Sequence, residues 1–152
     1  MNRFYFVGVA LVLGVLVLGM IFAAARIGFF VDMPSVLMVI VPAVILSLAA
    51  FPPRVIGRSF SAAFSRREAS EADLRQAVVF FRFVERTVLL SGLIAALLGI
   101  VTILSLLRGI AMENIGQGFA LLLLSVFYSL VLMLVVAVPF RAAVERRLAE
   151  KS

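Results

Sequence analysis

The most informative pattern in this chain is the alternation of long uncharged apolar runs with short charged segments. Four runs contain no Asp, Glu, Lys or Arg, and each has at least 21 residues: 4–25, 33–53, 87–107 and 114–140. A helix of about 20 apolar residues spans the hydrocarbon core of a bilayer. The runs do not alternate polar and apolar residues as membrane β-strands do. The pattern predicts an all-α membrane protein with four transmembrane helices, at about 4–25, 34–52, 87–107 and 115–139.

The first run has an alternative interpretation as a cleavable signal peptide, because it follows a basic residue and ends in three alanines at 23–25. Signal peptides have apolar regions of about 7–15 residues, whereas this run continues for about 20. The length favours a first helix that is retained in the membrane.

The segments between the runs carry start and stop signals for helices. We expect a tight turn at 26–31, followed by a second helix that Asp32 caps and in which Pro34 occupies the first turn. A cap is preferred to an ion-binding role for Asp32. Pro42 is expected to kink this helix unless a neighbour satisfies the freed carbonyl, and Pro52 and Pro53 mark its end.

The long polar segment at 53–86 is predicted to be a helical loop. Ile56, Phe60 and Phe64 recur every four residues, which indicates a short amphipathic helix lying on the membrane surface or against a partner helix. A turn is expected at 65–67. Ser70 and Asp73 have the spacing of a capping box, so a single long helix is expected from there to residue 107. The outer loop is expected to hold Arg108, Glu113, Asn114 and Gly116. The fourth helix is expected to end near Pro139 and pass into an amphipathic tail at 140–152, which with the 53–86 segment would form short helical extensions of the membrane spans.

Composition narrows the class further. The chain is 64% hydrophobic, with a mean hydropathy of +1.22, which excludes an ordinary soluble domain. It contains no Cys and no His, and we find no nucleophile–base set, paired carboxylates or phosphate-binding loop. We therefore expect neither an enzyme nor a metal or cofactor site.

The basic residues predict how the chain is oriented. Of the 14 Lys and Arg residues, twelve lie before the first run, between the second and third, or after the fourth, and only Arg26 and Arg108 lie in the other two loops. The positive-inside rule then places both termini and the 53–86 loop in the cytoplasm. This N-in/C-in topology accounts for the net charge of +6, so nucleic acid is not an expected partner.

Small residues follow one side of the third apolar run. Gly92, Ala96 and Gly99 form a stripe with almost no side-chain bulk, and the neighbouring face carries Thr102. In lipid, such a stripe allows another helix to approach closely, which motivates a homo-oligomer. The fourth run carries Ser125 and Ser129 one turn apart. Each hydroxyl also has the plainer interpretation of a bond to its own helix backbone.

Three segments in order resemble one family, the MotA/PomA flagellar stator channel subunits, and more distantly the ExbB/TolQ proteins. They are FFVDMPSVLMVIVPAVI at 29–45, FFRFVERTVLLSGLIAALLGIVTIL at 80–104 and IGQGFALLLLSVFYSLVLMLVVAVPF at 115–140. The glycine pair at Gly92 and Gly99, and Tyr128 and Pro139, fall in the register of that family. Together with a first helix in the corresponding place, the resemblance covers nearly the whole chain.

The resemblance implies a ring of identical subunits, five in number, in the bacterial inner membrane. The ring would enclose a pair of single-span MotB/ExbD-like partner helices that carry an intramembrane Asp, so that this chain needs no such carboxylate of its own. It also implies residues that line an ion path and residues that pack helices together. The ion-path candidates are Ser125, Ser129, Thr102, Ala96 and Val126, and the packing or oligomer candidates are Gly92, Ala96, Gly99, Pro139 and Tyr128.

Departures from the family leave two alternatives open. Where the family usually has a hydroxyl residue beside a small residue in the third helix, this chain has Ala95 and Ala96. The family's paired threonines of the fourth helix correspond to Ser125 and Val126, so one hydroxyl remains. A proline at the start of the family's third helix is replaced by Leu89. Only the short 54–86 segment stands where flagellar stators have a large cytoplasmic domain, so flagellar torque is not expected. The resemblance thus implies an ion-driven (proton or sodium) motor subunit, and the alternatives are a non-conducting oligomeric scaffold or an unrelated four-helix membrane protein.

Overall fold

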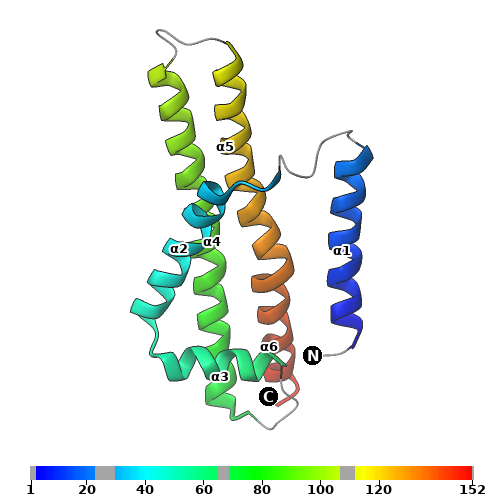
Figure 1. Cartoon of the computed structure of the whole chain (residues 1–152). Coiled ribbons are helices and arrows are strands. Elements are labelled where there is room, and N and C mark those ends of the chain that lie inside the picture. The colour runs from blue at the N-terminus through cyan, green and yellow to red at the C-terminus, as the bar shows by residue number, and fades with distance from the viewer. Residues whose placement is uncertain (1–2, 23–29, 65–68, 107–111, 152) are drawn as a thin grey trace.

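The computed structural model describes residues 3–22, 30–64, 69–106 and 112–151, and within these ranges the chain is helical apart from short connections. This confirms the prediction of an all-α chain. The elements in chain order are α1 (Arg3–Phe22), α2 (Met33–Ala50), α3 (Pro53–Phe64), α4 (Glu71–Leu106), α5 (Met112–Leu132), the π-helical turn η2 (Met133–Ala137) and α6 (Val138–Ala149) (Figure 1). The turn expected at 26–31 lies largely outside the described residues, and the turn expected at 65–67 lies wholly outside them. The end of the first predicted span, at 23–25, also lies outside them.

Three stretches of the described chain are long and apolar enough to cross a membrane: Met33–Ala50, Glu71–Ser105 and Gly118–Ala149. A shorter apolar helix, Val7–Phe22, lies within α1. Large aliphatic side chains cover the outside of these helices; Leu11, Val101 and Leu123 are each more than 60% exposed. A soluble domain rarely exposes so continuous an apolar surface, whereas hydrocarbon solvates it. The chain is therefore a multi-pass membrane protein with three to four apolar helices that can span the bilayer.

The long helix α4 confirms the prediction of an unbroken rod, since it contains 36 residues. At 1.5 Å per residue it is about 54 Å long, well over the roughly 30 Å of a hydrocarbon core. Its uncharged part, 87–106, is by itself long enough to cross that core, and its charged part, 71–86, is additional length. Ser70 begins the helix as the capping-box pattern predicts: the backbone N–H of Asp73 donates to its hydroxyl at 3.1 Å.

The polar end of the molecule has its own aromatic core, in which α3 folds back across α4 and α6. Phe80, Phe81 and Val144 are almost completely buried there. The Phe60 ring lies 5.5 Å from that of Phe81, and the Phe64 ring lies 4.8 Å from that of Phe140. The amphipathic helix expected from the four-residue spacing is thus present, and its apolar face packs on helices of the same chain.

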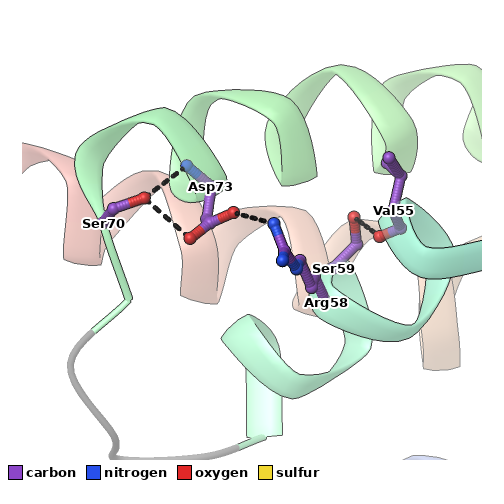
Figure 2. A network of polar contacts seen from close by, with 5 residues as sticks. All are labelled: Val55, Arg58, Ser59, Ser70 and Asp73. Carbon is purple, nitrogen blue, oxygen red and sulfur yellow. Dashed lines mark hydrogen bonds and ion pairs between the residues drawn. The ribbon is translucent and has the colours of Figure 1, made fainter.

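Polar contacts tie these three helices together. Figure 2 shows the Asp73 carboxylate between the Ser70 hydroxyl, which donates to it at 2.7 Å, and the Arg58 guanidinium of α3 at 3.5 Å. The Ser70 hydroxyl, helped by the charge of Arg58, holds the pKa of Asp73 below its usual value. On the other side of α4, Arg82 pairs with Glu145 of α6 at 3.0 Å.

Helix α2 begins and ends as predicted. The Asp32 side chain accepts the backbone N–H of Ser35 at 2.8 Å, and Pro34 lies in the first turn. Pro42 lies inside the helix, which continues past it to Ala50. The expected end before Pro53 is confirmed, and Pro53 then starts α3.

The fourth predicted helix differs from expectation at both ends. It begins at Met112, so Glu113, Asn114 and Gly116 lie in α5 and not in a loop. At its other end the helix does not stop near Pro139, because the chain stays helical through η2 and α6 to Ala149. The helical tail expected after Pro139 is present as α6. In α-helical geometry a proline ring collides with the carbonyl four residues earlier. Here the turn before Pro139 is a wider π turn, in which the N–H of Val138 donates to the carbonyl of Met133, five residues back.

Helix α1 runs beside the rod formed by α5, η2 and α6 (Figure 1). A cavity of about 230 Å³ separates the two, lined by Gly8, Val9 and Val12 on one side and by Leu134, Val135 and Pro139 on the other. Pro139 therefore faces α1 across a gap in the described structure.

Candidate functional site

The small-residue stripe of α4 packs directly against α5 of the same chain. A Cβ atom built on Gly92 would lie 2.4 Å from the Ser129 hydroxyl oxygen, and one built on Gly99 would lie 3.2 Å from Cβ of Leu122. Ala96 is 7% exposed. The close approach that the sequence predicts is thus present, and it is intramolecular. A second copy of the chain is not needed to explain the stripe.

A third glycine completes this interface from the opposite helix. A Cβ on Gly118 of α5 would lie 2.5 Å from Cγ1 of Ile103 on α4. Sequence reasoning missed this contact, because Gly118 follows Gly116 at the polar start of the helix, where a glycine has no obvious neighbour. The signal that could have found it is the position of Ile103, which continues the Ala95–Gly99 face by one more turn.

Two of the hydroxyl candidates are satisfied within their own helices. Ser129 donates to the Val126 carbonyl at 2.8 Å and is 1% exposed, because Gly92 covers it. Thr102 donates to the Leu98 carbonyl at 2.8 Å. Val126 is half-buried on α5. The plain interpretation, a bond back to the helix, therefore holds for Ser129 and Thr102.

Ser125 lies one turn from Ser129 in a different setting. It is 4% exposed and lines a cavity of about 220 Å³ between the start of α2, α4 and α5. The polar side chains of the cavity are those of Asp32, Ser35, Thr102 and Ser125, and the rest of its wall is mostly aliphatic. This volume accommodates several water molecules, and water occupies a cavity when polar partners are present. The structure thus brings two of the five ion-path candidates, Ser125 and Thr102, to one cavity.

Asp32 reaches this cavity because α5 fixes the backbone that precedes α2. The Tyr128 hydroxyl accepts the backbone N–H of Asp32 at 2.9 Å and donates to the carbonyl of Phe30. Tyr128 therefore does more than pack, since it anchors the chain just before α2. The expectation that Asp32 caps α2 is confirmed, but the sequence did not predict that Asp32 also lines a cavity with Ser125.

The chemistry available in the cavity is that of oxygen ligands. A carboxylate and three hydroxyl groups can solvate a proton, a hydrated cation or a chain of water molecules in a mostly aliphatic wall, where a bare ion is very unfavourable. Each hydroxyl that donates to its own backbone can still accept a hydrogen bond. In the part of the chain that the structure describes, no three His, Cys, Asp or Glu side chains come together as a metal site would require.

Comparison with models of known protein families gives no match for this chain. Comparison with curated proteins gives none either.

Proposed function

We propose that this chain is the channel-forming subunit of an ion-driven complex of the MotA/ExbB kind. Identical copies, five by resemblance, would form a ring around single-span partner helices, and protons or sodium ions would cross the membrane between ring and partner. The partner would carry an Asp within its span. The complex would lie in the bacterial inner membrane, with both termini and α3 on the cytoplasmic side, where the positive-inside rule favours twelve of the 14 basic residues.

The observation that carries the proposal is the shared cavity of Asp32 and Ser125. Ser125 is the fourth-helix hydroxyl that keeps the register of the family, and it lines a cavity with four polar residues between described apolar helices. A carboxylate beside hydroxyl groups in an otherwise aliphatic region is costly for a membrane protein to maintain. Such groups usually mark a path for ions or protons.

The packing within the chain refines how a ring would form. Because Gly92 and Gly99 are covered by α5 of the same subunit, contacts between subunits would use the exposed aliphatic faces of the spans. Such faces are available on both α4 and α5, for example at Val101 and Leu123. The substitution Gly99→Leu would then separate α4 from α5 inside each subunit before it affected assembly.

A second candidate, a non-conducting oligomeric scaffold, has an observation of its own. Ser129 and Thr102 donate to backbone carbonyls of their own helices, and Ser129 fills the space beside Gly92. These hydroxyls behave as packing elements. If Ser125 and Asp32 hold only trapped water, the complex would assemble without carrying ions.

Native mass measurement of the full chain in mild detergent tests the assembly. The proposal predicts a defined multiple of the 16.5 kDa subunit, with additional mass from a single-span protein when the chain is purified from its own membrane. A monomer at every detergent concentration that preserves the helices would contradict both candidates. Ion flux, considered in the Discussion, separates one candidate from the other.

A further inference from the structure

A second polar cavity lies where the charged part of α4 meets its uncharged part. It has a volume of about 420 Å³ and is lined by Arg82, Glu85, Arg86, Leu89, Met133 and Arg141. The first uncharged run of α4 starts at residue 87. The cavity is therefore at the level where the hydrocarbon core of a bilayer gives way to the headgroups.

The charges around this cavity are not balanced. Three guanidinium groups face a single carboxylate, that of Glu85, which pairs with Arg141 at 2.5 Å. Arg82 is paired with Glu145 from outside the cavity. Among the described residues Arg86 has no hydrogen-bond or ion-pair partner. The buried Nε atom of Arg141 has no hydrogen-bond acceptor, but it lies 3.6 Å from Oε1 of Glu145. The cavity thus presents donors that an anion could satisfy.

The other side of the cavity is apolar and continues onto the outer surface of the spans. Leu89 and Met133 form its wall. The residue that follows each of them lies on the outer surface: Leu90 of α4 is 55% exposed, and Leu134 of η2 is 53% exposed. A ligand bound here would therefore have its anionic group against arginine and its remaining surface against aliphatic side chains.

We propose that this cavity binds the headgroup of an anionic phospholipid. Guanidinium groups suit phosphate because their planar donors match its oxygens, and basic pockets between membrane helices bind such headgroups. The lipid phosphate would lie near Arg86, with the acyl chains along Leu89 and Met133. A free phosphate ion would not use the apolar wall, which is why the lipid is favoured as the source of the anion. The proposal does not depend on ion conduction.

The test is lipid binding to the purified full chain in detergent, followed by native mass spectrometry. Phosphatidylglycerol and phosphatidylcholine serve as the probes, and inorganic phosphate serves as the competitor. The variant is Arg86→Gln, because no described partner of Arg86 is lost with the charge. The matched control is Arg54→Gln, since Arg54 is an exposed arginine of α3 at the same end of the molecule that does not line the cavity.

The unmutated chain is expected to retain phosphatidylglycerol in preference to phosphatidylcholine. Arg86→Gln should weaken phosphatidylglycerol binding about five-fold, the effect of one arginine at a charged membrane surface, whereas Arg54→Gln should change it little. Equal binding of both lipids, or an equal loss in Arg54→Gln, would overturn the proposal. Displacement of the lipid by inorganic phosphate at low concentration would also overturn it and identify a site for the free ion.

Discussion

Gly92 of α4 and Ser129 of α5 are in direct contact: a Cβ atom on Gly92 would lie 2.4 Å from Oγ and 2.5 Å from Cβ of Ser129. The Ser129 hydroxyl donates to the backbone carbonyl of Val126 in its own helix. Because Gly92 has no side chain, the Ser129 side chain fits in the space beside it. This contact sets how closely the two long spans approach. It also fixes the position of Ser125, one turn away, at the wall of the cavity.

The first prediction concerns this contact. Gly92→Ala should destabilise the chain by about 1–3 kcal/mol, the usual cost of overpacking, because both the Ser129 side chain and the Ser125 carbonyl are too close. Adding Ser129→Gly should recover part of the loss, since the methyl group then occupies the vacated space. Thermal unfolding in detergent measures both variants.

Gly57→Ala on α3 is the matched control for that prediction. A Cβ atom there would meet nothing within 4 Å, and alanine favours a helix over glycine by about 0.5–1 kcal/mol. Stability should therefore stay the same or rise. An equal loss in Gly57→Ala and Gly92→Ala would show that the α4–α5 contact is not as close as described.

The second prediction concerns pH. The Ser70 hydroxyl and the Arg58 charge lower the pKa of Asp73 from its ordinary value of 3.8. A folded-state pKa below the unfolded one contributes stability that is fully present above the unfolded pKa and is lost as the pH falls through the folded pKa. The stability difference between the unmutated chain and Asp73→Asn should therefore shrink over the acidic range, as the pH falls from well above 3.8 to below it. A difference that is constant over this range would contradict the assignment.

The third prediction concerns the number of spans. If α1 crosses the membrane, reporters fused before Arg3 and after Lys151 should both lie in the cytoplasm, and a reporter inserted after Gly109 should lie outside. If α1 does not cross, the reporters at the two termini should lie on opposite sides. Accessibility in intact cells therefore decides between three spans and four.

Much of this architecture could be predicted from the chain because local rules govern it. The uncharged runs give the spans, and Asp32, Ser70 and the glycine stripe of α4 act through neighbours within a few residues or within one helix face. The identity of the helix that covers the stripe could not be predicted. A helix face of small residues indicates close packing, but it does not show whether the packing helix belongs to the same chain. The contact between Gly92 and Ser129 in the structure shows that this helix is α5.

The polar cavity could be predicted only in part. Ser125 and Thr102 were recognisable as hydroxyls in apolar runs, but Asp32 joins them through Tyr128, which lies 96 residues away in the sequence. The π turn before Pro139 was also hidden, because it depends on which hydrogen bonds the surrounding packing permits. Contacts between distant segments are not visible in the periodicity of either segment.

The fourth prediction separates the two roles of Asp32. Asn caps a helix about as well as Asp, so Asp32→Asn should keep the bond to the Ser35 N–H and leave the thermal midpoint nearly unchanged. The substitution removes the negative charge from the cavity. Partner-dependent ion flux should therefore fall while assembly persists. Unchanged flux would limit Asp32 to capping α2.

The most direct test of the proposed function is proton or sodium uptake by vesicles that contain the chain and its single-span partner. Ser125→Ala removes a hydroxyl from the cavity wall and little volume. Ser129→Ala removes the same group one turn away, where it is bonded to its own backbone beside Gly92. We expect Ser125→Ala to lower the ion flux at least about ten-fold, because it removes a hydrogen bond to a charged species. Ser129→Ala should retain most of the ion flux. Undiminished flux in Ser125→Ala would contradict the proposed path, and no partner-dependent flux in the unmutated chain would favour the scaffold.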